Sequence, residues 1–215
     1  MKGIFVTFEG IEGCGKSTQA FYLYERLLNN RYPVILTREP GGTEAGTKIR
    51  NILLESHSIA PLTELFLFLA DRNQHIRELI VPSIENGIIV ICDRFYHSTY
   101  AYQAGGRKVS IETVKRLNEI ALEGLKPDLT FLIDVPVETG FNRKKSENLN
   151  LDRIEKEDFE FHNSIRNAYL EMAKSDSNII LINGLKSKEE IKAEIFKTFE
   201  NKFQAFLKKD SLVKI

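Results

Sequence analysis

The chain alternates short apolar runs with longer segments in which apolar residues recur every three or four positions. Five runs are rich in β-branched and aromatic residues without strict alternation, which is typical of strands covered on both faces. These predicted strands are residues 4–8, 34–37, 88–92, 129–133 and 179–182. Helical spacing between them, as at Ile111, Val114, Leu117 and Ala121, predicts crossover helices. We therefore expect one α/β domain over residues 1–215, with a parallel sheet between two layers of helices.

Two of the helical segments have further implications. Residues 191–207 carry apolar side chains at one helical face, which predicts a packing helix within a C-terminal helix and tail at about 187–215. Residues 62–70 are apolar in every direction, so a helix there must be covered all round. We expect the sheet on one side of it and, on the other, a ligand pocket, a partner subunit or both. A central core helix is the alternative.

Composition excludes several classes of protein. The 215 residues include 30 basic and 30 acidic side chains, so broad electrostatic binding to nucleic acid or to an anionic membrane is not expected. Two cysteines, Cys14 and Cys92, are too few for a disulfide scaffold or a four-cysteine zinc site. The sequence has no apolar run of membrane-spanning length, and its first residues lead directly into a strand. We therefore expect a cytoplasmic protein.

The strongest motif is G-x-x-x-x-G-K-[ST], which follows the first predicted strand and precedes a helix. Its glycines let backbone N–H groups converge on phosphate oxygens, and the helix start adds its positive dipole end. We expect Lys16 to reach the β- and γ-phosphates of a nucleotide and Ser17 to ligate Mg²⁺. The alternative is a plain glycine-rich turn. The motif and the residue after it comprise Gly10, Ile11, Glu12, Gly13, Cys14, Gly15, Lys16, Ser17 and Thr18.

Further charged residues stand where two other strands end. Asp93 follows a buried apolar run, where it could hold Mg²⁺ or merely cap the next helix. Arg38 and Arg94 also lie just after strands, and each alone could form a surface ion pair. Since the carboxyl ends of parallel strands share one edge, two arginines there suggest a second anion site beside the first. A second phosphate site indicates an acceptor that already carries phosphate.

Residues from about 142 to 155 have the composition of a mobile lid. The basic triplet Arg143, Lys144 and Lys145 precedes a polar stretch, residues 146–151. Asp152 and Glu155 have the spacing of a helix cap with its reciprocal acid. A cation in a first helical turn opposes the dipole, so we expect Arg153 to face an anion. A solvated basic loop is the alternative for the triplet.

Together these residues fit phosphoryl transfer between two phosphates. Mg²⁺ would compensate the crowded negative charge together with Lys16, Arg38, Arg94, Arg153 and the basic triplet. A phosphate acceptor is already ionised and needs no general base. Catalysis would then consist of alignment and charge stabilisation, while the lid excludes water.

The motifs resemble those of thymidylate kinases, the dTMP kinases among the P-loop nucleoside monophosphate kinases. The resemblance runs from about residue 3 to 184 and has five parts. They are residues 8–18, Thr37-Arg38-Glu39-Pro40-Gly41-Gly42-Thr43, Leu69-Ala70-Asp71-Arg72, Asp93-Arg94 with Ser98-Thr99 and Tyr102-Gln103, and Asp152-Arg153-Ile154-Glu155. It implies a three-layer P-loop NTPase fold with a five-stranded parallel sheet and a short lid. It also implies ATP and Mg²⁺ as cofactors and phosphorylation of dTMP to dTDP in dTTP biosynthesis.

The resemblance also implies roles for individual residues. Arg38 and Arg94 would hold the dTMP phosphate, and Glu12 would contact the sugar 3′-hydroxyl. Phe68 would stack on thymine and Arg72 would bond it; the two positions are one helical turn apart and share a face. Ser98, Thr99 and Gln103 would lie near the base, and Tyr102 under the sugar, where a ribose 2′-hydroxyl would clash. Without an arginine in the phosphate loop, the chain resembles the bacterial kind, and Arg143 and Arg153 are candidates for the lid cation. The family usually forms homodimers through the helix that holds Phe68.

Two other readings remain open. One is a kinase for another acceptor, such as a deoxynucleoside or guanylate kinase. A nucleoside kinase must deprotonate a hydroxyl and would need a base near Asp93, whereas paired arginines favour a phosphate acceptor. The other is a nucleotide-switch module, although the sequence lacks the Asn-Lys-x-Asp stretch of guanine-reading switches.

Overall fold

The computed structural model describes residues 2–146 and 152–210. In these ranges five strands form one all-parallel sheet in the order β2-β3-β1-β4-β5. The strands are β1 (Phe5–Glu9), β2 (Val34–Arg38), β3 (Ile89–Asp93), β4 (Leu129–Asp134) and β5 (Ile179–Asn183). The predicted α/β fold with its five-stranded parallel sheet is confirmed. Each strand ends one residue later than predicted, so Arg38 and Asp93 belong to their strands, where they pair in the ladder.

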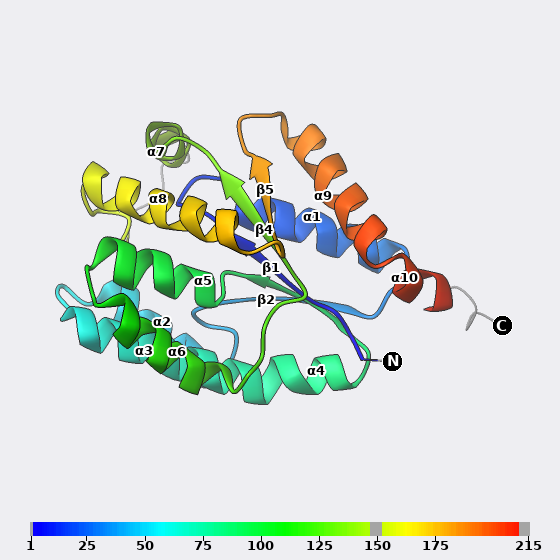
Figure 1. Cartoon of the computed structure of the whole chain (residues 1–215), viewed down its shortest axis with the longest axis horizontal. Helices are drawn as coiled ribbons and strands as arrows, with labels where there is room; N and C mark the ends of the chain where they lie inside the picture. Colours follow the sequence, from blue (N-terminus) through cyan, green and yellow to red (C-terminus); the bar gives the residue numbers. More distant parts are fainter. Residues whose placement is uncertain (1, 147–151, 211–215) are drawn as a thin grey trace.

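Helices cover both faces of this sheet (Figure 1). The helices are α1 (Lys16–Asn29), α2 (Glu44–Glu55), α3 (Pro61–His75), α4 (Val81–Glu85), α5 (Tyr96–Thr99), α6 (Ile111–Leu122), α7 (Val137–Ser146), α8 (Phe159–Ser175), α9 (Lys188–Lys202) and α10 (Gln204–Asp210). Two π-helical segments, η1 (Ile76–Ile80) and η2 (Tyr100–Gly106), continue α3 and α5. The start of β1 and the end of α10 lie on the same side of the molecule, away from α7.

The strands divide their side chains between two apolar clusters. Val6 and Phe8 of β1 join the larger cluster, which includes Leu23 of α1 and Ile195 of α9. Phe5 of the same strand faces the other cluster, with residues of η1 and α4. Alternate residues of a strand point to opposite faces, so both faces of β1 are buried. Burial on both faces explains why the strand patterns do not alternate between apolar and polar.

The last predicted helix is interrupted. Instead of one helix through residues 191–207, α9 ends at Lys202 and α10 starts at Gln204. Phe203 between them has φ −113° and ψ 24°, outside helical geometry. Its ring still packs on Phe199, at 5.0 Å between centroids. The apolar spacing correctly predicted which face of this segment is buried. It could not reveal the break at Phe203, because the apolar spacing continues across it.

Helix α3 has different neighbours from those expected. The sheet does not form its main cover; α3 packs chiefly against α2 and α6. Leu65 and Leu69 are buried there, whereas Leu62 and Phe66 are about half exposed. Part of the apolar surface of this helix is therefore uncovered in a single chain.

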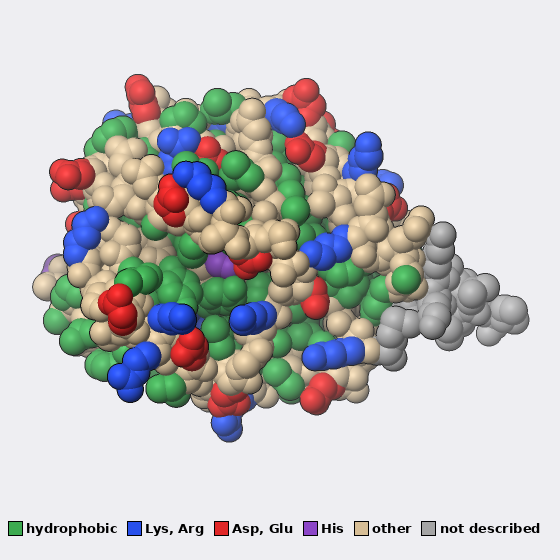
Figure 2. Space-filling model, viewed as in Figure 1, with side chains coloured by type: hydrophobic (Ala, Val, Ile, Leu, Met, Phe, Trp, Pro, Cys, Tyr) green, Lys and Arg blue, Asp and Glu red, His purple; other side chains and the backbone are tan. Residues whose placement is uncertain are grey.

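The surface agrees with the balanced charge. On the face shown in Figure 2, basic and acidic side chains are interspersed among apolar and neutral ones. Within the described ranges, no helix combines the length and the apolar character needed to cross a bilayer.

Candidate active site

A cleft opens at the carboxyl edge of the sheet, where β1, β2 and β3 end. The register places Arg38 beside Asp93 and Asp93 beside Phe8, so the loops after these strands emerge side by side. The cleft brings together twelve residues predicted from the sequence: Glu12, Lys16, Ser17, Arg38, Phe68, Arg72, Asp93, Arg94, Ser98, Thr99, Tyr102 and Gln103. Ligands of open parallel sheets bind at this edge.

The loop between β1 and α1 has the backbone that phosphate binding requires. Gly13 has φ +70°, and a Cβ there would lie 2.2 Å from the Gly140 carbonyl oxygen of α7. Gly15, with φ +94°, precedes α1, and no side chain of the described residues caps that helix. Its first N–H groups and its dipole are thus available to an anion. Ile11 and Cys14 of the same loop are buried in the core, and Gly10 also has a positive φ.

Lys16 lies at the start of α1 with its ammonium turned back into this loop. Its Nζ donates to the Glu12 Oε2 at 3.2 Å and to the Ile11 carbonyl at 3.4 Å. The residue is only 6% exposed, yet it lines the cleft. A buried ammonium next to free helix N–H groups is suited to the phosphates of a nucleotide.

Ser17 and Asp93 fit a magnesium site. The Ser17 hydroxyl donates to the Asp93 Oδ2 at 2.5 Å, which joins α1 to the end of β3. Asp93 Oδ1 is buried and has no hydrogen-bond partner among the described residues. Hydroxyl and carboxylate oxygens are the ligands that Mg²⁺ prefers, and it usually completes its shell with water and phosphate. In the described ranges no cluster of three His, Cys, Asp or Glu side chains could hold a metal by itself.

Arg94 is held rigidly in the cleft. Its backbone has φ +71°, and its Nη1 donates to the Gly10 carbonyl, Ser98 Oγ and Tyr169 hydroxyl. Its Nη2 donates to Glu12 Oε1 at 2.6 Å. Burial disfavours the charge of this guanidinium, but the Glu12 carboxylate raises the pKa of Arg94 further above its usual value. Arg94 is therefore a permanent, preoriented cation.

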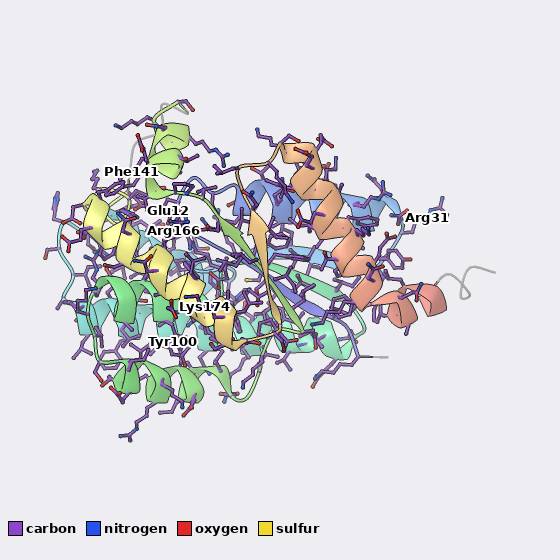
Figure 3. All side chains as sticks on the ribbon, turned by 45° about the horizontal axis from the view of Figure 1, so that its top comes forward. Glu12, Arg31, Tyr100, Phe141, Arg166 and Lys174 are labelled. Atoms are coloured by element: carbon purple, nitrogen blue, oxygen red, sulfur yellow. The ribbon has the colours of Figure 1, made fainter. Side chains whose placement is uncertain are left out.

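Glu12 connects the two halves of the cleft. Its carboxylate accepts from Lys16, from Arg94 and, at 3.0 Å, from the Tyr102 hydroxyl. Burial would raise the pKa of Glu12, but the charges of Arg94 and Lys16 outweigh it and lower the pKa well below the usual range. In Figure 3 Glu12 lies on the same side of the molecule as Phe141 of α7, and Arg31 lies on the far side. Glu12 stays ionised and can accept from a ligand hydroxyl.

Arg38 and Arg50 form a second positive region of the cleft. Arg38, the last residue of β2, is exposed to the cleft. Arg50 of α2 also lines it and donates to the Pro40 carbonyl at 2.9 Å. Burial and the nearby Arg38 charge lower the pKa of Arg50, so an anion between the two would relieve their repulsion.

Arg72 lies on α3, one turn after Phe68. Only 2% of Arg72 is exposed, yet it lines the cleft. Its Nη1 donates to Thr99 Oγ1 at 2.6 Å and to Asn118 Oδ1 at 2.9 Å, and its Nε to Glu39 Oε2 at 2.9 Å. Tyr102 stacks under Arg94, with 5.0 Å from the guanidinium carbon to the ring centroid. The aromatic ring of Phe68 and the fixed hydrogen-bond donor of Arg72 suit a flat heterocycle with acceptors on its edge.

Arg153 faces an anion, as predicted, but one outside the cleft. Its guanidinium donates to Glu64 of α3 and to the Leu53 carbonyl. The expected helix start was wrong: residues 152–157 form a turn, and α8 begins at Phe159 with Asp158 as its cap. Asp152 and Glu155 do make the reciprocal cap bonds, which a single turn satisfies without a helix. The dipole reasoning for Arg153 therefore does not apply.

The basic triplet belongs to helix α7, not to a loop. Arg143 donates to the Gly184 carbonyl at 2.9 Å and to the Gly13 carbonyl at 3.5 Å, so it braces the phosphate loop from behind. Lys144 lines the cleft and pairs with Glu155 at 2.9 Å. Of the predicted lid, residues 147–151 lie outside the described residues.

Sequence reasoning did not single out two cleft residues, Arg50 and Leu54. It named Glu39, Pro40, Asp152, Ile154 and Glu155 only as parts of motifs, without a role in ligand binding, and Lys144 only as part of the basic triplet. Arg50 could have been found, because it shares a helical face with Gly46 and Leu53, both buried. The role of Glu39 could not, because its partners come from α3 and only the folded chain brings them together.

Beneath the Arg38 loop, Asp71 is buried and its carboxylate accepts from the Gly41 N–H at 2.9 Å. Burial and the Glu39 charge raise the pKa of Asp71 from 3.8 to about 6. A raised acid pKa means that the folded state favours the protonated form. This contribution to stability is present below the unfolded pKa and is lost as the pH rises through about 6.

We expect Asp71→Asn to be more stable than the parent at pH 8, by on the order of 3 kcal/mol, because the amide oxygen keeps the Gly41 bond without the charge. The advantage should shrink by roughly 1–2 kcal/mol at pH 5. Urea unfolding at the two pH values measures both differences. A difference that does not change with pH would show that Asp71 titrates normally.

The parallel sheet, the glycine-rich loop and the Lys16–Ser17–Asp93 cluster together define a P-loop NTPase, with a second positive region, Arg38 and Arg50, in the same cleft. Residues 8–195 match the family model described as Thymidylate kinase. The chain belongs to the thymidylate kinase family.

Relatives with that name are similar over most of their length. The thymidylate kinase of Fervidobacterium nodosum is 50% identical over 196 residues, covering 91% of this chain and 98% of the relative. The thymidylate kinase of Halothermothrix orenii is 46% identical over 199 residues, covering 91% and 96%. That of Trichormus variabilis is 46% identical over 195 residues, covering 89% and 92%.

Proposed function

We propose that this protein transfers the γ-phosphoryl group of ATP to the phosphate of dTMP, which yields dTDP and ADP. One observation carries the proposal: a phosphate loop and a pair of cleft arginines lie side by side at one sheet edge, with Arg38 and Asp93 paired in the ladder. The oxygen of the acceptor phosphate forms the new P–O bond, and the bond from the γ-phosphorus to the β–γ bridging oxygen breaks. An ionised acceptor leaves no proton to remove, so no general base is required.

On the donor side, the loop of residues 10–18 and the start of α1 would hold the ATP phosphates. Lys16 would neutralise the β- and γ-phosphates. Ser17 and Asp93 would hold Mg²⁺, which supplies charge neutralisation and fixes the phosphate geometry. Asp93 Oδ1, buried and unpartnered among the described residues, supports this assignment.

On the acceptor side, Arg38 and Arg94 would hold the dTMP phosphate, with Glu12 on the sugar 3′-hydroxyl. Tyr102, bonded to Glu12, would lie under the sugar and disfavour a 2′-hydroxyl. Phe68 and Arg72 would stack on and bond the thymine ring. Ser98, Thr99 and Gln103 complete this end of the cleft.

The acceptor preference tests the proposal. With Mg-ATP and the four acceptors dTMP, dUMP, dGMP and UMP in a coupled ADP-release assay, we expect dTMP to give the highest kcat/KM. Thymidine, which lacks the phosphate, should not be turned over. Equal use of all four acceptors, or turnover of thymidine alone, would refute the substrate assignment.

Four side chains are proposed as catalytic cations: Lys16 and Arg94, which line the cleft, and Arg143 and Arg153, which would first have to leave their present hydrogen-bond partners. For Arg153, the guanidinium would have to leave Glu64 to reach the transferring phosphoryl group. We expect Arg153→Ala to lower kcat far more than it weakens ATP binding. Arg107→Ala is the matched control, because Arg107 donates to the same carboxylate. If Arg107→Ala lowers kcat equally, or Arg153→Ala changes only KM, Arg153 is a structural or binding group.

We further propose that the protein is cytoplasmic and works as a homodimer through α3. Leu62 and Phe66, 48% and 54% exposed, support α3 as the contact. A second copy packed on this helix would complete the cover that its apolar pattern requires.

A further inference from the structure

Glu39 lies between the two ends of the acceptor site. It directly follows Arg38, the proposed phosphate ligand, and is only 4% exposed. Its Oε2 accepts from Arg72 Nε at 2.9 Å, and Arg72 is the proposed base ligand. One side chain thus joins the phosphate-binding strand end to the base-binding helix.

The other oxygen of Glu39 is held just as firmly. His75 Nδ1 lies 3.0 Å from Glu39 Oε1, and His75 Nε2 lies 2.8 Å from Thr37 Oγ1. Because a carboxylate oxygen only accepts, His75 Nδ1 donates to Glu39, while Nε2 and the Thr37 hydroxyl share the second hydrogen bond. His75 is fully buried, and a Cβ on Gly42 would lie 2.4 Å from its Nε2, so the loop backbone rests on the ring.

These bonds fix the plane of the Arg72 guanidinium. They use Nε and Nη1, while the group also lines the cleft. What Arg72 presents to the cleft is a hydrogen-bond donor, because arginine has no acceptor. A rigid donor favours a base with a carbonyl oxygen at that position and rejects a base with an amino group there.

We propose that Glu39 is the positioning residue for this site. By orienting Arg72 it sets the preference for a pyrimidine with a carbonyl group, and by directly following Arg38 it fixes the position of that phosphate ligand relative to Arg72. The proposal rests on the proposed function and adds the residue that couples its two acceptor contacts. Glu39 itself acts through Arg72 and His75, not on the substrate.

Kinetics of four proteins with dTMP and dCMP test this. Thymine has a carbonyl at C4, where cytosine has an amino group; cytosine also lacks the N3 proton and the 5-methyl group, differences that are the same for every protein tested. We expect Glu39→Gln to raise the KM for dTMP about 10-fold or more and to lower the dTMP-over-dCMP ratio of kcat/KM by about 10-fold, with the KM for ATP within about twofold of the parent. A merely structural residue would lower the active fraction without changing that ratio.

Two His75 variants keep the test decisive if Glu39→Gln does not fold. His75→Gln places its amide near Nε2, so it keeps the Thr37 contact and loses the Glu39 contact. His75→Asn places its amide near Nδ1 and can still donate to Glu39. We expect the first to show the loss of base preference and the second to recover most of it.

An unchanged dTMP-over-dCMP ratio in folded Glu39→Gln or in His75→Gln would overturn the proposal, as would an equal rise in the KM values for dTMP and ATP. The parent protein separates this from the proposed function. If the parent protein shows no preference for dTMP, both the proposed function and the role of Glu39 are refuted. If the parent prefers dTMP and the variants keep that preference, only the role of Glu39 is refuted.

Discussion

Replacing Arg94 by alanine should lower kcat/KM for dTMP by on the order of 10³-fold, the effect of removing a fixed donor from a phosphoryl-transfer site. Arg94 donates to four acceptors and lines the cleft together with Lys16 and Arg38. Its loss would remove the proposed phosphate contact and would leave Glu12 with less compensation in a partly buried position. Steady-state kinetics with dTMP at saturating Mg-ATP measure the change.

Two further variants isolate the cause. Arg94→Lys keeps the charge but not the planar fork, so we expect an intermediate loss of about 10²-fold. Arg31→Ala is the matched control, because Arg31 also has a left-handed backbone, φ +63°, and lies on the far side of the molecule from Glu12 (Figure 3). Activity of Arg94→Ala within about tenfold of the parent would exclude Arg94 from phosphate binding.

The largest effect on stability is expected at Glu64. This side chain of α3 is 1% exposed and accepts from Arg107 at 3.1 Å, from Gln103 at 3.0 Å and from Arg153. Glu64→Gln removes the charge that two partly buried arginines share. Breaking a buried ion pair by removing one partner costs about 3–5 kcal/mol, because the remaining charge is left uncompensated. For a chain of this size that corresponds to a fall in Tm of roughly 6–20 °C.

Glu157→Gln is the control for this prediction. Glu157 bonds the same Arg107 at 2.5 Å, but it is 33% exposed, so water replaces much of what it supplies. We expect less than about 1 kcal/mol for it. Thermal and urea unfolding of both variants give the comparison, and similar small losses would mean that the Glu64 cluster is held by packing alone.

Much of the fold was predictable because the information is local. Buried strands show as apolar runs, and a phosphate loop needs glycines and a lysine at fixed spacing. Parallel strands then bring their carboxyl ends to one edge whatever the details of packing. The amino-acid sequence by itself therefore indicates that Lys16, Asp93, Arg38 and Arg94 lie near one another.

What could not be predicted depends on contacts between elements distant in the sequence. Glu39 and His75 are 36 residues apart, and nothing in either local pattern indicates that they bond. The position of Arg153 on Glu64 joins residues 89 apart. The motif Asp152–Glu155 was recognised by its spacing, but the spacing serves a turn as well as a helix. Local rules thus located the site, whereas its supporting network required the tertiary structure.

The central claim is that two separate phosphate sites lie next to each other at the sheet edge, one at Lys16 and one at Arg38. Calorimetric binding of dTMP and of the non-hydrolysable β,γ-imido analogue of ATP, with Mg²⁺, to Lys16→Met and Arg38→Ala tests it most directly. We expect Lys16→Met to weaken the ATP analogue and Arg38→Ala to weaken dTMP, each by about 10-fold or more, with the other ligand within about twofold. If both variants weaken the same ligand, or Arg38→Ala leaves dTMP binding unchanged, the cleft does not contain two phosphate sites in this arrangement.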